Sequence, residues 1–238
     1  MTTAEYLSDS YARTCDATVI AVIEEGGLIL DRSIFYPTSG GQPGDSGTLA
    51  WGDHQLEIAT TIKGEEGAII CIPAEPKPLP SIGQEVKQDI NWERRYRHMR
   101  MHTALHLLSV VIPLPVTGGS IGSDKSRLDF DMAEPPEDKE ALSQALNDLI
   151  NGDYEISETW ITDQDLDDNP GLVKTLRVQP PRGTGRIRLV RIGTQDHQVD
   201  LQPCGGTHVA RTSEIGRMRI SKIEKKGKQN RRVHVVFD

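Results

Sequence analysis

The stretch WERRYRHMRMHTALHLLSVVI, residues 92–112, divides the sequence into two unlike parts. It favours a helix that Pro113 and Pro115 would end, because proline lacks the backbone N–H and clashes with the preceding turn. Before it come short apolar runs separated by turn residues, and after it helical and strand patterns alternate. We therefore predict a helix here, at the start of a second domain.

The first part of the chain predicts β structure. Residues 17–36, ATVIAVIEEGGLILDRSIFY, are rich in β-branched side chains and are interrupted by Gly26 and Gly27, which is a hairpin signal. Shorter apolar runs follow at 47–51, 54–64 and 67–73. Several short strands at this spacing are typical of a small barrel. We expect an N-terminal β-barrel domain over residues 1–90, with the proline-rich segment 73–86 as a loop near its edge.

The second part, residues 91–238, predicts helices together with strands. A helix is expected over 134–152, because Pro135 and Pro136 precede leucines at helical spacing (Leu142, Leu146, Leu149). Strands are expected at 127–132, 186–193, 197–203, 215–227 and 230–238. The predicted fold class is α+β, a small β-barrel followed by a two-layer α/β domain with a mainly antiparallel sheet.

Composition limits the setting in which the protein works. No window approaches the roughly 20 apolar residues of a membrane span, and the N-terminus lacks the pattern of a secretory signal. Its three cysteines are odd in number and widely separated, which favours a reducing compartment. We expect a cytoplasmic protein without a membrane partner.

Charge is unevenly distributed along the chain. The net charge of −8 argues against a protein that wraps nucleic acid, but residues 93–100 and 217–232 are basic. These runs are either solvated surface or local contacts to a phosphate backbone. Since they flank the two motifs described next, we prefer the second interpretation.

Two pairs of potential metal ligands have the same spacing. His102 and His106 lie four residues apart and would share one helix face, pointing either at a metal ion or at the core. The metalloprotease motif H-E-x-x-H is excluded, since Thr103 occupies the position of its general base. Cys204 and His208 are also four apart, on a stretch whose glycines favour a loop. Thiolate and imidazole together suit zinc, so the two pairs predict one tetrahedral site.

Three segments resemble, in the same order, the editing domain of alanyl-tRNA synthetase and its free-standing AlaX-type relatives. They are HTALHLL (102–108), SRLDFDM (126–132) and CGGTHVARTSEIG (204–216). Upstream, LDRSIFYPTSGGQPGDSGTL (30–49) is similar to the glycine-rich stretch of the synthetase and of the medium-sized AlaX proteins. The resemblance implies zinc bound by His102, His106, Cys204 and His208 in a hydrolase that edits in trans, without ATP.

The implied reaction is deacylation of mischarged tRNA(Ala), with serine as the first expected amino acid and glycine as the second. Zinc can lower the pKa of a bound water to about 7 and polarise an ester carbonyl. Four protein ligands, however, normally close a structural site. Either the metal gains a fifth ligand, or one ligand such as His208 is loose, or the metal orders a pocket in which the substrate's own hydroxyl helps to activate water.

Discrimination against alanine would require a hydrogen bond to the serine hydroxyl. By resemblance to the family's pocket, Thr117 is the first candidate, with a simple turn residue as its alternative interpretation, and Thr103 is the second. The resemblance also implies that the glycine-rich stretch closes over the pocket. Its candidate residues are Gly40, Gly41, Gln42 and Asp45.

The expected partner is the acceptor end of tRNA(Ala). Its phosphate contacts are expected at Arg94, Arg95, Arg97, Arg217, Arg219, Lys222, Lys225, Lys226, Lys228, Arg231 and Arg232. Two alternatives to the editing enzyme are a tRNA-binding module with a purely structural zinc and a hydrolase of another small ester or amide. The sequence leaves a monomer and a homodimer equally open.

Overall fold

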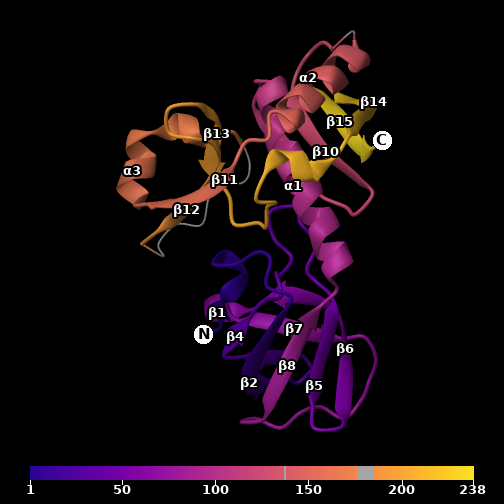
Figure 1. Ribbon diagram of the computed structural model, residues 1–238, viewed down its shortest axis with the longest axis vertical. Coiled ribbons are helices and arrows are strands. Elements are labelled where there is room, and N and C mark those ends of the chain that lie inside the picture. Colours follow the sequence, from indigo (N-terminus) through magenta and orange to yellow (C-terminus); the bar gives the residue numbers. More distant parts are fainter. Residues whose placement is uncertain (137, 176–184) are drawn as a thin grey trace. The chain divides into compact units, whose positions relative to one another are not determined.

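The computed structural model describes residues 1–136, 138–175 and 185–238 (Figure 1). The chain divides into two compact units, Met1–Arg97 and His98–Asp238. The division falls inside helix α1 (Trp92–Val111), whose extent agrees with the helix expected at 92–112. In the described part of the chain, no helix is both long and apolar enough to cross a membrane.

The first unit contains a closed six-stranded barrel, which confirms the predicted barrel. Its strand order is β2-β3-β7-β6-β5-β8, and each pairing is antiparallel where the register is defined. The strands are β2 (Thr14–Val22), β3 (Leu28–Leu30), β5 (Gly47–Trp51), β6 (His54–Lys63), β7 (Ile69–Pro73) and β8 (Glu85–Ile90). A short parallel pair, β1 (Thr3–Ala4) with β4 (Arg32–Ser33), and the 3₁₀ turns Glu5–Leu7 and Glu65–Gly67 complete the unit.

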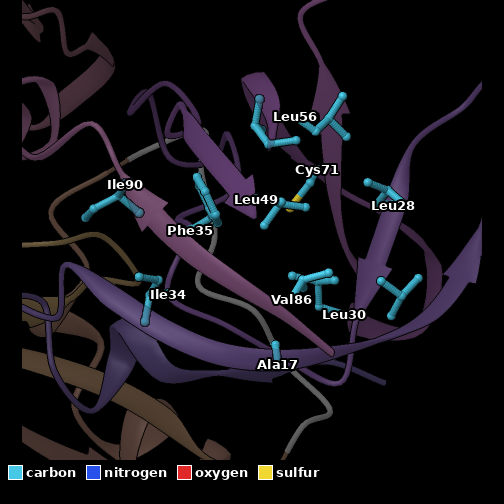
Figure 2. Packing of buried hydrophobic residues seen from close by; sticks show 12 residues of the cluster. Ala17, Leu28, Leu30, Ile34, Phe35, Leu49, Leu56, Cys71, Val86 and Ile90 are labelled. Atoms are coloured by element: carbon cyan, nitrogen blue, oxygen red, sulfur yellow. The ribbon is translucent and has the colours of Figure 1, made fainter. Parts of the chain in front are cut away.

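Alternating apolar residues fill the barrel (Figure 2). On β8, Val86 and Ile90 point inward between exposed neighbours, which is the period of two expected for a strand with one buried face. Gln88 shares that face and is hydrogen-bonded at both ends of its amide, because its nitrogen donates to the Arg32 carbonyl and its oxygen accepts from the Ser33 hydroxyl. This buried amide therefore holds β4 to the barrel at little cost in unpaired polar groups.

The second unit contains a four-stranded antiparallel sheet of order β14-β15-β10-β9. Its strands are β9 (Val116–Ser120), β10 (Lys125–Asp131), β14 (Met218–Gly227) and β15 (Asn230–Phe237). Helix α2 (Lys139–Asn151) packs along the edge strand β14. The Asn147 side chain both donates to the Met218 carbonyl and accepts from the Met218 N–H, so this part of the edge is paired rather than open.

Helix α2 begins later than the sequence suggested. Pro135 and Pro136 lie before the helix, and the Asp138 side chain caps it by accepting from the Ala141 N–H at 2.8 Å. An aspartate at the N-cap satisfies a backbone donor that no helical carbonyl can reach. The cap, not the prolines, therefore sets the first residue of this helix.

A second antiparallel sheet has the order β11-β12-β13 and is formed by Ile156–Ile161, Ile187–Gly193 and Gln198–Pro203. Helix α3 (Asp163–Asp168) and the 3₁₀ turn Pro170–Leu172 accompany it, and Leu166 packs with Ile187 and Leu189 in a small core. The second unit is thus α+β and antiparallel, as expected, but its strands form two sheets instead of one. The two-layer arrangement stays a prediction.

Candidate metal centre

Helix α1 and the loop after β13 bring four potential ligands together. The ligand atoms of His102, His106, Cys204 and His208 all lie within 4.8 Å of one another. The Cys204 Sγ is 3.4 Å from the His102 Nε2 and 3.2 Å from the His208 Nε2. Ordinary zinc–sulfur and zinc–nitrogen bond lengths in a tetrahedron place such atoms about 3.5 Å apart. The four side chains could therefore hold a metal ion.

His106 is oriented by a carboxylate on β13. Its Nδ1 lies 3.1 Å from the Asp200 Oδ2, which also accepts from the Gln202 amide at 2.7 Å. The Lys174 ammonium pairs with the other oxygen of Asp200 at 2.5 Å. A carboxylate at Nδ1 fixes the proton there and leaves the Nε2 lone pair for a metal.

His208 is oriented by a hydroxyl instead. Its Nδ1 lies 3.1 Å from the Thr103 Oγ1, and the Thr103 hydroxyl donates to the Met99 carbonyl at 2.9 Å. His208 and Thr103 are both buried. The histidine that sequence reasoning offered as the loose ligand is therefore enclosed and bonded on its far side.

The electrostatics favour ligands that are ready for a metal. Burial raises the pKa of the Cys204 thiol, but the neighbouring histidines, His102 first among them, outweigh burial and hold it well below its ordinary value. Burial, together with His102, lowers the pKa of His208 to about 3, so this imidazole is neutral. A thiolate and a neutral imidazole are the forms that coordinate metals.

His106 behaves differently from His208. Burial lowers its pKa, but the hydrogen bonds with Asp200 and Cys204 prevail and raise it to about 9. Burial also acts against ionisation of Asp200, while His106 and Lys174 hold the pKa of that carboxyl well below its ordinary value. In the absence of metal His106 is thus protonated at neutral pH, and it must release a proton when a metal binds.

Arg188 on β12 holds the loop that carries Cys204. Its Nη1 donates to the carbonyls of Cys204 at 2.9 Å and Gly206 at 2.8 Å, and its Nη2 pairs with Glu158. The Gly206 N–H in turn points at the Cys204 sulfur, 3.4 Å away. The planar guanidinium presents its donors in a fixed geometry and so holds the two carbonyls and the carboxylate in place, whereas a lysine ammonium is a single point on a flexible stem.

Sequence reasoning missed Arg188, Asp200, Gln202 and Lys174. A signal existed for two of them, because Asp200 and Gln202 lie at alternate positions of a strand that ends just before Cys204 and so share one face. No such signal marked Lys174 or Arg188, whose roles depend on contacts between distant segments.

Thr103, the second candidate for recognising serine, makes its hydrogen bonds inside the protein. It is fully buried, and its hydroxyl also faces the Val209 N–H at 3.4 Å in addition to Met99 and His208. One hydrogen and two lone pairs are all that a hydroxyl offers. A contact between Thr103 and the amino acid stays a prediction, and these internal contacts reduce the support for it.

Thr117, the first candidate for recognising serine, is half-buried on β9. Its hydroxyl donates to the Asp129 carbonyl at 3.1 Å and accepts from the Asn230 amide at 2.5 Å. Since its hydrogen is already used, it could only accept a hydrogen bond from a serine hydroxyl.

The glycine-rich stretch lies in the first unit. Gly40 and Gly41 have positive φ values of 55° and 83°, a region that favours glycine, and Ser39 pairs with Gln42 across this turn. Gln42 and Asp45 are buried. The Asp45 carboxylate accepts from the Tyr36 N–H at 2.7 Å and from Arg95, so at least one of its oxygens is used within the unit.

Three of the expected phosphate contacts are engaged inside the protein. Arg95 is fully buried and bonds Asp45 and the Ser10 carbonyl, and Arg231 is buried with bonds to the Gly227 and Ala133 carbonyls. Arg232 forms a two-pronged ion pair with Asp129. The phosphate contacts expected at Arg95 and Arg231 stay a prediction, with less support because both side chains are buried and bonded to other described residues.

The remaining basic residues differ in their surroundings. Arg94 donates to the Gly44 carbonyl at 2.6 Å, and Arg97 is partly buried. The exposed members are Arg217, Arg219, Lys222, Lys225, Lys226 and Lys228, all on or beside β14.

Comparison with known proteins identifies the family of the chain. Residues 187–234 match the family model described as the threonyl and alanyl tRNA synthetase second additional domain, and residues 8–94 match the model of class II (A) tRNA synthetases. The alanyl-tRNA editing protein AlaX-M of Methanosarcina mazei is 34% identical over 244 residues, covering 98% of this chain and 96% of that protein. The chain belongs to the AlaX family of alanyl-tRNA editing proteins.

Two further relatives of this AlaX family member are longer proteins. AlaX-L of Pyrococcus horikoshii is 33% identical over 94% of this chain, which spans 55% of that protein. The alanine–tRNA ligase of Pyrobaculum calidifontis is 32% identical over 92% of the chain and 25% of the ligase. The chain therefore corresponds to about a quarter of that synthetase, and the resemblance inferred from its motifs is confirmed.

Proposed function

We propose that the protein is a trans-editing hydrolase that removes the wrong amino acid from mischarged tRNA(Ala) in the cytoplasm. The observation that carries the proposal is the convergence of His102, His106, Cys204 and His208 in a chain whose relatives are named alanyl-tRNA editing proteins. An aminoacyl ester is an activated substrate, so its hydrolysis requires no strong protein nucleophile.

Zinc is the proposed metal, since three imidazoles and one thiolate are its preferred donor set. When bound, it would supply Lewis-acid polarisation of the ester or the order of the pocket around it. The protein itself keeps Cys204 as a thiolate, orients His106 through Asp200 and fixes the ligand loop through Arg188. A loose His208 loses support, because its far nitrogen is bonded and the ring is buried.

Serine is the proposed amino acid, with glycine second. Thr117 remains the first candidate for the serine hydroxyl, acting as an acceptor only. Gly40, Gly41, Gln42 and Asp45 are proposed to contribute to specificity, with the two glycines allowing close approach of the backbone to a ligand. A pocket that hydrogen-bonds serine would disfavour alanine, because its own polar groups would then stay unpaired.

The proposed partner surface is the exposed basic face of β14 and the turn after it. Positive side chains there can neutralise phosphates of the acceptor end and release counterions. Contacts of Arg94 and Arg97 with tRNA phosphates are also proposed, although Arg94 already donates to the Gly44 carbonyl.

The decisive experiment measures deacylation of Ser-, Gly- and Ala-tRNA(Ala) by the purified protein, with and without a chelator. We expect rapid release of serine, slower release of glycine and sparing of alanine, with activity lost on metal removal. Cys204→Ala should lose both zinc and activity. A protein that binds tRNA and zinc but releases no amino acid would instead be a binding module with a structural metal, which the four-ligand set also allows.

A further inference from the structure

Thr103 directly follows the proposed ligand His102 in the sequence. Its side chain nevertheless contacts the loop after β13 that carries Cys204 and His208, here called the ligand loop. Its Oγ1 lies 3.1 Å from the His208 Nδ1 and 3.4 Å from the Val209 N–H, both on the ligand loop. Thr103 itself belongs to α1, which carries His102 and His106. One fully buried hydroxyl thus joins the two halves of the ligand set.

The hydrogen positions follow from counting donors and acceptors. The Thr103 hydroxyl gives its hydrogen to the Met99 carbonyl, one turn earlier in the helix, at 2.9 Å. Its lone pairs are then available to the N–H of Val209 and to a proton on the His208 Nδ1. His208 Nε2 faces the Cys204 sulfur at 3.2 Å, so this nitrogen is the one that points into the cluster.

We propose that Thr103 is a positioning residue that fixes the Nδ1–H tautomer of His208 and so prepares its Nε2 for the metal. The inference rests on the proposed metal centre and deepens it. It gives the two histidines different supports, a neutral hydroxyl behind His208 and a carboxylate behind His106. Outer partners of this kind typically change metal affinity by 10–100-fold when removed.

The test compares two substitutions of Thr103. Thr103→Val keeps the shape but leaves the His208 Nδ1–H buried without an acceptor, whereas Thr103→Ser keeps the hydroxyl. We expect zinc affinity, measured by competition with a chromophoric chelator, to fall 10–100-fold in Thr103→Val and to stay within about 2-fold of wild type in Thr103→Ser.

Thr212→Val provides the matched control. Thr212 is also fully buried in the second unit, and its hydroxyl donates to the Ile150 carbonyl and accepts from the Tyr154 N–H without touching a ligand. This variant should lose stability but keep its zinc affinity. The proposal fails if Thr103→Val binds zinc like wild type, or if Thr103→Ser or Thr212→Val loses zinc to the same extent.

The tautomer itself can be read in the wild-type protein, so the proposal stays testable even if Thr103→Val does not fold. Long-range ¹H–¹⁵N correlation spectra of the full chain, recorded with and without zinc, should show a proton on the His208 Nδ1. A protonated Nε2 in the metal-free protein, or zinc on Nδ1 in the loaded one, would overturn the proposal. Since neither measurement uses deacylation, failure here is distinguishable from failure of the editing function.

Discussion

At the scale of single residues, the Asp200 carboxylate that contacts His106 offers the most direct test of the metal centre. Asp200 accepts from the His106 ring at 3.1 Å and pairs with Lys174, and its side chain is fully buried. In Asp200→Asn the charge that favours the His106 orientation is lost, and the Lys174 ammonium loses its ion pair with this carboxylate. We expect zinc affinity to fall about 10-fold or more in the chelator competition.

Asp148→Asn is the control for this substitution, because Asp148 lies exposed on α2 and its side chain accepts from its helix neighbour Gln144. Its zinc affinity should match that of wild type. If Asp200→Asn also matches wild type, the carboxylate does not support the metal centre.

Sequence patterns predicted the potential ligands better than the residues that support them. The same spacing of four residues separates His102 from His106 and Cys204 from His208. Such a short spacing can be recognised in the sequence without knowledge of the tertiary structure. Arg188 and Lys174 contribute through contacts 16 and 26 residues away, at Cys204 and Asp200. Such contacts join segments that are distant in the sequence, so no local pattern predicts them.

At the scale of elements, an ion pair links two central strands of the four-stranded sheet. Asp129 on β10 lies opposite Arg232 on β15 and accepts from its Nε at 2.7 Å and its Nη2 at 2.8 Å. Burial raises the pKa of Asp129, but Arg232 and Arg127 prevail and lower it below its ordinary value. The ionised pair therefore stabilises this strand pairing.

The lowered pKa of Asp129 makes its contribution to stability depend on pH. A carboxyl whose pKa is lower in the folded state stabilises the protein above the unfolded pKa of about 3.9, and the contribution disappears as pH falls through the folded pKa. Asp129→Asn should therefore cost on the order of 1 kcal/mol at pH 7 and less near pH 3, in urea unfolding of variant and wild type.

Asp131→Asn on the same strand is the control, since the Asp131 side chain is exposed. It should change stability little at either pH. A loss in Asp129→Asn that is equal at both pH values would contradict the electrostatic explanation and indicate a packing effect.

Whole elements could be predicted where the sequence pattern was strong. Their boundaries could be predicted less consistently, because a proline marked the end of α1 but not the start of α2. The helix expected at 92–112 is α1, and its end agrees with the prediction because Pro113 cannot continue a helix. The start of α2 was wrong, since the prolines at 135 and 136 drew the expected boundary away from the capping Asp138. The division of the later strands into two sheets depends on which strands pair, and strand patterns alone do not specify partners.

At the scale of the whole molecule, an acidic chain is proposed to bind an acidic partner. The net charge of −8 opposes long-range attraction, so binding has to depend on local cations. Several exposed cations near β14 are already paired, Lys222 and Lys226 with Glu224, and Arg217 with Asp238. Lys225 and Lys228 are exposed and make no ion pair with any residue of the described segments. We therefore assign them the strongest phosphate contacts.

The double variant Lys225→Ala, Lys228→Ala should weaken tRNA(Ala) binding and lower the slope of log affinity against log salt by about 0.9 for each duplex phosphate that the protein no longer neutralises. Lys63→Ala with Lys77→Ala changes the net charge equally from exposed positions on the barrel unit and is the matched control. Binding titrations at several salt concentrations distinguish a direct phosphate contact from a general effect of net charge. Loss of a phosphate-binding side chain changes the slope in one double variant, whereas a general charge effect changes both double variants alike. Equal slopes for both double variants would remove the β14 face from the tRNA interface.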